Sequence, residues 1–416
     1  MPGKRLLICG PVFPASDVGG LQLALWDLAS SLGQRGWDVD LAVTPERLGL
    51  RDDSRAPRLR GLAHARWSPL PRFRFLPDDV RTVLQHVLLD GGFARVQSDL
   101  LRTLDRRIRE RRYDAVIACV PREAPGLARF ITDAHPNTII LSLEAIAGEL
   151  RRRRWLALPR VVARTVGRTW THPAIYRAID PARAGVVVFA SHAWRDEALA
   201  AGLPPHVART IYFGLRDVPP LTPPRPVANR LLWVGRLSRE KGLDLFIEAL
   251  PLLRRHRPLT VTAVCGQGPG DYRRAIERRI EQLGLGDVVQ LLPAVPREAL
   301  TDFYQTHDAL LFHSIFSEPV ALVVAEAFAA GLPVIASAPR GSSALVIPDT
   351  TAMCFAHADP QSIAATVLQT LEDDERRLRI RSEAHALVRR EFSLDRMASA
   401  WDEILEERLG ARAGCA

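Results

Sequence analysis

The chain alternates short apolar runs with amphipathic stretches, and this pattern predicts strands and helices in turn. Residues 5–10 (R-L-L-I-C-G) form an apolar run that is typical of a buried strand. The stretch from Leu21 to about Leu32 repeats its apolar residues at helical spacing, and residues 38–43 predict another strand. Strand, loop, helix and strand in this order are typical of the opening of a doubly wound α/β domain.

The same pattern continues more loosely through the rest of the first half. Further strands are predicted at 114–120, 138–144 and 185–190, the last followed by a helix with Ser191 as its N-cap. Helical spacing is also present from 84 to 108. Residues 51–77 lose periodicity and become basic and aromatic, which predicts a long loop or a small insertion.

A proline-rich segment divides the chain. Residues 219–228 (P-P-L-T-P-P-R-P-V-A) hold too many prolines for a helix or a strand, so we expect a stiff linker there. The boundaries that follow are an N-terminal Rossmann-like domain at 1–218, a C-terminal Rossmann-like domain at 229–392 and a last helix at 393–410.

The second half opens with a strand and a charged turn, R-L-L-W-V-G-R-L-S-R-E-K-G. The strand is predicted to end at Gly235 and a helix to begin about Gly242. Arg236 and Lys241 therefore lie where the carboxyl end of a strand meets a helix, which is where ligands bind in open α/β sheets. A charged turn on its own is more often simply solvated. A second strand ends in a glycine turn at Gly266 and Gly268.

An apolar helix with one internal carboxylate is predicted near residue 325. Ser317, Glu318 and Pro319 are typical of a helix start, and Gly331 with Pro333 of its end. Glu326 lies within the apolar run, so protein groups or a ligand must supply hydrogen-bond donors to it.

Two interpretations of this glutamate pair remain open. On a continuous helix, eight residues would separate Glu318 and Glu326 by about 12 Å along one side, roughly the reach of a nucleotide sugar. Alternatively, Glu318 favours only the helix N-terminus and Glu326 pairs with a core arginine.

Composition narrows the class of protein. The chain has 416 residues, of which 47% are hydrophobic, enough for two cores. It shows neither an apolar run of 18 residues nor a signal-peptide pattern, so we expect a protein that stays in the cytoplasm. The 5 cysteines are scattered and argue against a disulfide framework or a zinc site.

Positive charge is concentrated in the first half. Residues 1–218 carry 33 Lys and Arg against 22 Asp and Glu, whereas the rest carries 23 against 25. Arg160, Arg164 and Arg168 share a helix face within residues 151–170, which indicates either a membrane-surface helix or a solvated helix packed on the sheet. No nucleic-acid-binding module accompanies these arginines, so a nucleic-acid partner is not expected.

The charged turn and the glutamate pair together resemble a known family. The string V-G-R-L-x-x-x-K-G, and a glutamate followed after seven residues by E-A-F-A-A-G-L-P-V-I-A, look like the signature of retaining, group 1 (family 4) glycosyltransferases of GT-B fold. The chain departs from that pattern at His313-Ser314, where the family usually has proline-serine. It departs again at Val320-Ala321, where the family often has phenylalanine-glycine.

The resemblance assigns roles to individual residues. It implies that Arg236 and Lys241 bind the departing diphosphate, that Glu318 faces the transferred sugar, and that Glu326 holds the ribose. The remaining donor contacts that it implies are Gly19, Gly20, Gly266, Gly268, Val320, Ala321 and Leu322. Arg340 is a further candidate for a phosphate or acceptor contact.

The resemblance also implies an architecture and an activity. We expect two Rossmann-like domains facing each other across a cleft, with the last helix crossing back to the first domain. The expected activity is retaining transfer of a sugar from a UDP- or GDP-sugar, without a metal or another cofactor. Cell-envelope polysaccharide, glycolipid or glycoconjugate biosynthesis is the expected setting.

The identity of the acceptor and two rival functions stay open at this point. The arginine-rich first domain favours an anionic or lipid-linked acceptor, with contact to the inner membrane face as a hypothesis. The rivals are a nucleotide-sugar epimerase and a non-catalytic nucleotide-sugar-binding protein.

Overall fold

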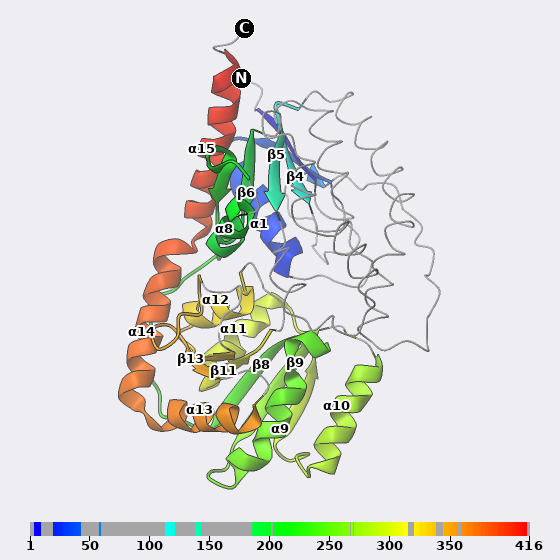
Figure 1. Cartoon of the computed structure of the whole chain (residues 1–416), viewed down its shortest axis with the longest axis vertical. Coiled ribbons are helices and arrows are strands. Elements are labelled where there is room, and N and C mark those ends of the chain that lie inside the picture. Colours follow the sequence, from blue (N-terminus) through cyan, green and yellow to red (C-terminus); the bar gives the residue numbers. More distant parts are fainter. Residues whose placement is uncertain are drawn as a thin grey trace.

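Two parallel β-sheets, each flanked by helices, make up the described part of the chain (Figure 1). The computed structural model describes residues 4–9, 20–42, 58–59, 113–120, 138–142, 185–200, 203–266, 268, 270–314, 320–337, 344–355 and 359–413. Among these residues, no helix combines the length and the apolar character that crossing a bilayer requires.

The first sheet has seven strands in the order β3-β2-β1-β4-β5-β6-β7, and all neighbouring strands are parallel. Its strands are β1 (Arg5–Cys9), β2 (Asp38–Ala42), β3 (Arg58–Leu59), β4 (Ala115–Val120), β5 (Thr138–Ser142), β6 (Val186–Phe189) and β7 (Ala208–Thr210). The helical segments among the described residues of this domain are α1 (Gly20–Gln34), α8 (His192–Ala200) and the 3₁₀ turn η3 (Pro205–Val207). A strand order that starts in the middle and grows to both sides is that of a doubly wound domain.

The second sheet repeats this topology with six parallel strands in the order β10-β9-β8-β11-β12-β13. Its strands are β8 (Arg230–Arg236), β9 (Thr260–Gly266), β10 (Val289–Pro293), β11 (Ala309–Phe312), β12 (Val334–Ser337) and β13 (Met353–Phe355). The helical segments are η4 (Arg239–Lys241), α9 (Leu243–Arg254), α10 (Gly270–Gln282), α11 (Arg297–Thr306), α12 (Leu322–Ala329) and α13 (Pro360–Glu372).

The second sheet has a separate apolar core on each face. One core packs α9, α10 and α13 against the sheet, with Trp233 and Phe246 at its centre. The other packs α12 and α14 (Asp374–Glu391) against the opposite face, around Phe328 and Phe392. Because strands β8, β11 and β12 are covered on both sides, they are nearly continuous apolar runs rather than alternating ones.

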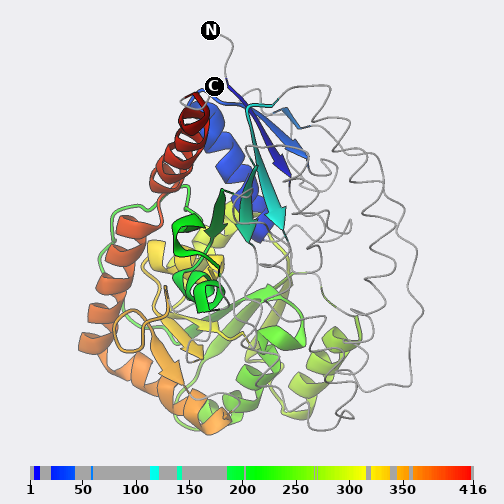
Figure 2. The same cartoon turned by 45° about the horizontal axis from the view of Figure 1, so that its top comes forward.

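The last helix, α15 (Leu394–Ala413), packs on the first domain. Met397, Trp401 and Leu405 are buried with α1 and the first sheet. Figures 1 and 2 both place this red helix beside the blue α1, and α14 leads up to it from the second domain. The chain therefore crosses between domains twice, once through the irregular segment 211–229 and once at the junction of α14 and α15.

One local prediction is wrong, and another is confirmed in position only. The predicted start of the glutamate helix at 317–319 is not where α12 begins, because Val320 and Ala321 are not helical and Leu322 is its first residue. The estimate of 12 Å along a continuous helix from Glu318 to Glu326 therefore does not hold. Ser191 does precede α8, but its buried Oγ makes no hydrogen bond with the described residues, so it provides no side-chain cap.

Several expectations fall outside the described residues. They concern Gly19, Glu318, Arg340, the helical pattern at 84–108 and the arginine-rich segment 151–170. Of the predicted loop at 51–77, only β3 is described.

Candidate functional site

Most of the candidate residues lie where the second sheet reverses its strand order. β8 lies at the centre, followed outward by β9 and β10 on one side and by β11, β12 and β13 on the other. The connections after β8 and β11 therefore leave the sheet in opposite directions from neighbouring strands. In open α/β sheets, ligands bind outside the carboxyl ends of the strands at such a reversal.

The charged turn after β8 is a closed, hydrogen-bonded unit. Arg236 is the last residue of β8, and Lys241 ends the single turn η4. The amide of Lys241 donates to the Ser238 carbonyl (3.0 Å), and Gly242 follows in the left-handed conformation with φ of 63°. A Cβ at Gly242 would lie 2.3 Å from the His313 ring, so this glycine lets the turn pack against the end of β11.

The glycine turn after β9 lies against the charged turn. The amide of Leu237 donates to the Gly266 carbonyl, and a Cβ on Gly268 would lie 1.9 Å from the carbonyl oxygen of Leu237. Tyr272 on α10 donates a hydrogen bond of 2.9 Å to Asp244 on α9. These contacts hold the two turns together, so the backbone around Arg236 and Lys241 is ordered in advance of any ligand.

The two cations of this turn differ in exposure. The Arg236 side chain is 54% exposed and pairs at 3.4 Å with Glu240, one turn along. Lys241 is half-buried, and its carbonyl accepts from the indole nitrogen of Trp233 at 3.4 Å. A surface pair such as Arg236–Glu240 contributes little to stability, so Arg236 can exchange it for a ligand anion at small cost.

Glu326 on α12 is bonded by two groups from α11. Arg297 Nε donates to one carboxylate oxygen at 2.8 Å, and the Tyr304 hydroxyl donates to the other at 3.0 Å. The Glu326 side chain is 16% exposed. The donors that a carboxylate in an apolar helix requires are therefore supplied by the protein, as in the alternative in which Glu326 pairs with an arginine.

The same arginine connects the two domains. Arg297 Nη1 donates at 3.0 Å to Asp27, which lies on α1 in the first domain and is 2% exposed. Asp27 also accepts from Arg216 Nε at 2.6 Å. Asp27, Arg297 and Glu326 thus form a series of ion pairs that runs from α1 of the first domain to α12 of the second.

Burial and neighbouring charges act in opposite directions on the pKa values of Glu326 and Arg297. Burial raises the pKa of Glu326, and the charge of Arg297 with the hydrogen bond from Tyr304 offsets only part of that rise. Burial also disfavours the Arg297 cation, but Glu326 and Asp27 outweigh it and raise the pKa of that guanidinium. Burial and the neighbouring Glu326 charge raise the pKa of Tyr304 well above its ordinary value, so the phenol stays a donor.

The backbone at the start of α12 faces the same edge of the sheet. Val320 and Ala321 are buried, and Ala321 is the N-cap residue without a side-chain hydrogen bond. The first amides of a helix have no intrahelical acceptor, so they can serve as donors to an anion. Leu322 packs against the cores of both domains, which fixes this helix end relative to α1.

Sequence reasoning missed part of this site. Asp27, Arg297 and Tyr304 belong to none of the motifs that the sequence shows. A signal for Asp27 does exist, because it is an acidic residue among the apolar positions of α1. Within the described residues, no three His, Cys, Asp or Glu side chains gather so that they could hold a metal ion.

Part of the chain matches a known protein family. Residues 224–386 match the model of the family described as glycosyl transferases group 1. That range contains the charged turn, the glycine turn, Arg297 and Glu326. The second domain is therefore a group 1 glycosyltransferase domain.

Individual relatives support the same class. The chain is 33% identical over 169 residues to an uncharacterized glycosyltransferase of Methanocaldococcus jannaschii (40% of this chain, 42% of the relative). It is 34% identical over 170 residues to a D-inositol 3-phosphate glycosyltransferase of Xylanimonas cellulosilytica (41% and 40%). The matches span about two fifths of the length of these curated relatives.

Solved structures resemble the whole chain. HepE of Anabaena, in complex with UDP and glucose, superposes with a TM-score of 0.68 at 19% identity and covers 97% of this chain and 100% of its own. Sucrose-phosphate synthase of Thermosynechococcus elongatus gives a TM-score of 0.73 at 20% identity, with 98% and 100% coverage. The chain therefore has the GT-B fold of two Rossmann-like domains, as predicted.

Proposed function

We propose that the protein is a retaining, family 4 glycosyltransferase that moves a sugar from a nucleoside diphosphate sugar to an acceptor hydroxyl. The observation that carries this proposal is the preordered turn holding Arg236 and Lys241 at the point where the second sheet reverses its strand order. Two cations fixed there would stabilise the charge that develops on a departing diphosphate. The complex of HepE with UDP and glucose supports a donor of this class, with UDP- and GDP-sugars as the first candidates.

The remaining donor contacts follow from the same edge of the sheet. Glu326 would accept the ribose hydroxyls, held in place by Arg297 and Tyr304. The amides of Val320, Ala321 and Leu322 would face the phosphates. Gly19 and Gly20, at the entrance to α1, would approach the donor from the first domain.

The proposed reaction forms one bond and breaks one on the same face of the sugar. The bond from the anomeric carbon to the β-phosphate oxygen breaks, and the acceptor oxygen bonds to that carbon. The acceptor proton passes to the leaving phosphate oxygen, so no protein nucleophile is required. Glu318 would orient the sugar, and Arg236 with Lys241 would stabilise the nucleoside diphosphate without a metal ion.

The setting and acceptor are proposed on weaker grounds. The arginine excess of the first domain and the relative named for D-inositol 3-phosphate both support an anionic or lipid-linked acceptor. Biosynthesis of a cell-envelope polysaccharide, glycolipid or glycoconjugate is the corresponding proposal.

Product analysis tests the class of reaction. The purified protein is incubated with UDP- and GDP-sugars, with and without candidate acceptors, and both the nucleotide and the sugar are followed by NMR. Release of nucleoside diphosphate with an unchanged anomeric configuration in the product is expected. An altered donor sugar without acceptor would indicate an epimerase, and no change at all a binding protein. Loss of activity after chelation would contradict metal independence.

Two variants separate the proposed role of Lys241 in binding the diphosphate from that of Glu318 in orienting the sugar. Lys241→Ala removes a preorganised cation, so we expect kcat to fall by about 10²–10³-fold and nucleotide-dependent thermal stabilisation to weaken. Glu318→Gln keeps the nucleotide contacts, so it should slow transfer while leaving that stabilisation nearly intact. Equal stabilisation of Lys241→Ala and native protein by nucleotide would contradict the assignment.

A further inference from the structure

A second, basic pocket lies on the opposite edge of the second sheet. It is lined by the linker at 222–225, the end of α11, the residues just before β11 and β12, and one side of α14. His307 and Asp308 immediately precede β11, and Pro333 precedes β12, so the pocket is at the amino ends of the strands. The charged turn and the glycine turn are at the carboxyl ends, so this pocket opens at the other edge of the sheet, although Tyr304, which donates to Glu326, also lines it.

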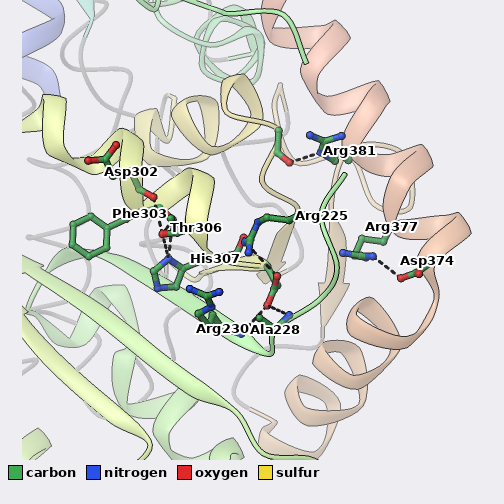
Figure 3. Close-up of polar contacts among 12 residues, drawn as sticks. Arg225, Ala228, Arg230, Asp302, Phe303, Thr306, His307, Asp374, Arg377 and Arg381 are labelled. Atoms are coloured by element: carbon green, nitrogen blue, oxygen red, sulfur yellow. Dashed lines mark hydrogen bonds and ion pairs between the residues drawn. The ribbon is translucent and has the colours of Figure 1, made fainter. Parts of the chain in front are cut away.

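Three arginines dominate the pocket (Figure 3). Arg225 comes from the linker, and Arg377 and Arg381 come from α14. Among the described residues that line the pocket, Asp308 is the one carboxylate, and it is 2% exposed. It accepts the amides of Ala228 and Arg230 at 3.0 and 2.8 Å, and it lies 3.3 Å from Arg225. The carboxylate therefore orders the linker and leaves two of the three arginine charges without a lining counterion.

His307 does not contribute a charge to the pocket at neutral pH. Its Nδ1 lies 2.8 Å from the Phe303 carbonyl, so it donates there, and its Nε2 accepts from Thr262 at 2.9 Å. Burial lowers the pKa of His307, with the charges of Arg230 and Arg225 as further causes. The ring is neutral at neutral pH, and the net charge of the pocket is set by its arginines.

The two arginines of α14 are a like-charged pair one turn apart. Burial lowers the pKa of Arg381, and the charge of Arg377 lowers it further. Arg381 is anchored by donating to the carbonyls of Gly331 and Thr222, both at 2.7 Å. It cannot easily turn away from Arg377.

Arg377 retains unused donor capacity. Its side chain is 9% exposed, and its Nε makes no hydrogen bond with the described residues. Its ion pair is with Asp374, which is 72% exposed and does not line the pocket. A buried guanidinium with an unpaired donor is unfavourable, and acceptor oxygens from a ligand would relieve it.

We propose that this pocket binds a small phosphate-type oxyanion. Guanidinium groups match phosphate oxygens in geometry and charge, and three arginines from two segments of the chain line this pocket. The ligand is either free inorganic phosphate or the phosphate group of a small metabolite. Because the linker between the domains forms one wall, a bound anion would stabilise that linker in its present position.

Binding of inorganic phosphate to the full-length protein tests the proposal. Calorimetric titration at constant ionic strength, with chloride as the reference anion, measures the affinity. A parallel titration with glycerol 3-phosphate distinguishes free phosphate from a phosphorylated metabolite.

Gln305 lines the pocket and is exposed, so Gln305→Glu adds a repelling carboxylate without disturbing the core. We expect Gln305→Glu and Arg377→Gln each to weaken phosphate binding about tenfold or more.

Two control variants locate the effect. Arg389→Gln makes the same charge change as Arg377→Gln on an exposed position of α14 outside the pocket, and it should bind phosphate as the native protein does. Lys241→Ala should keep phosphate binding while losing affinity for a nucleoside diphosphate. Absence of phosphate binding, native affinity in Gln305→Glu, or loss only in Lys241→Ala would each overturn the proposal. None of these outcomes depends on the protein being a glycosyltransferase.

Discussion

Glu326 is the residue whose environment differs most from what an isolated motif predicts. It is a carboxylate in an apolar helix, and Arg297 and Tyr304 supply its donors. Because Arg297 also bonds to Asp27, the carboxylate is held in one orientation by groups from both domains. A ribose arriving at Glu326 would therefore meet a preoriented acceptor rather than a mobile one.

Replacing Arg297 tests whether its contacts with Glu326 and Asp27 hold the site in place for a nucleotide. In Arg297→Gln, Glu326 loses its cation and keeps only the hydrogen bond from Tyr304, and a buried carboxylate without a neighbouring cation tends to take up a proton. We expect the affinity for nucleoside diphosphate to fall about tenfold or more, corresponding to a lost charge-assisted bond of roughly 1.5–3 kcal/mol. Nucleotide-dependent thermal shift measures it. Arg278→Gln, on the exposed side of α10, makes the same charge change and should behave as the native protein.

The titration of Glu326 gives a pH dependence of known sign. Burial raises its pKa, so on acidification the folded protein protonates this carboxyl before ordinary glutamates do. The ionised form accepts two ribose hydroxyls better than the protonated form, so affinity for a nucleotide sugar should fall as the pH falls through that raised pKa. A nucleotide sugar is the suitable probe because its diphosphate does not titrate in this range. Glu326→Gln should abolish the dependence, and an identical profile in that variant would contradict the assignment.

At the scale of elements, the packing of two turns against each other supports the candidate donor site. The glycine turn at 266–268 touches the backbone of Leu237, which lies between the two proposed diphosphate-binding cations. The Leu237 amide donates to the Gly266 carbonyl, so the two turns are also hydrogen-bonded to each other. The position of Arg236 and Lys241 therefore depends on the absence of a side chain at Gly268.

Replacing Gly268 by alanine tests the contact between the two turns. A Cβ at Gly268 would lie 1.9 Å from the carbonyl oxygen of Leu237, so the backbone of one turn must move. We expect Gly268→Ala to destabilise the fold by about 1–3 kcal/mol and to weaken nucleotide binding. Gly286→Ala is the matched control, because a Cβ at Gly286 has no atom within 4 Å. Chemical denaturation and nucleotide titration of both variants measure the difference.

Another feature at this scale is the late start of α12. Proline and a short polar residue at 317–319 are typical of a helix start, yet the helix begins at Leu322. Val320 and Ala321 are buried against the second sheet instead of continuing the helix. Packing thus overrides the local propensity, and it leaves backbone amides of the motif at the helix entrance.

At the scale of the whole molecule, the C-terminal helix belongs to the core of the first domain. Met397, Trp401 and Leu405 are buried together with residues of α1 and β1. Asp27 and Arg297 add a charged contact between the domains on the side of the candidate donor site. The first domain is therefore completed by residues that come after the entire second domain in the sequence.

Replacing Trp401 of α15 by alanine should destabilise the first domain, on which this helix packs. Trp401 is 1% exposed, and we expect Trp401→Ala to destabilise the first domain by about 3–5 kcal/mol. Hydrogen exchange should show faster opening in β1 and α1, whereas α9 and α10 should keep native protection. Glu403→Ala, at an exposed position of the same helix, is the control. Uniform loss of protection in both domains would show that they unfold as one unit.

The sequence by itself was sufficient for the features that depend on near neighbours. Apolar runs at 5–10 and 114–120 predicted β1 and β4, and V-G-R-L-x-x-x-K-G predicted the strand, turn and helix around Arg236 and Lys241. These predictions hold because strand burial, turn chemistry and helix periodicity are decided within a few residues. The resemblance carried by two motifs extended them to the GT-B fold.

Only the tertiary structure decided which groups meet across the molecule. Asp27 and Arg297 are 270 residues apart, and nothing in the local pattern pairs them. The same holds for Arg225 beside Asp308 and for the arginines of α14 that share its pocket. Such contacts arise when sheets and helices pack, because burial forces each charged group to bond with whichever partner the fold brings within reach.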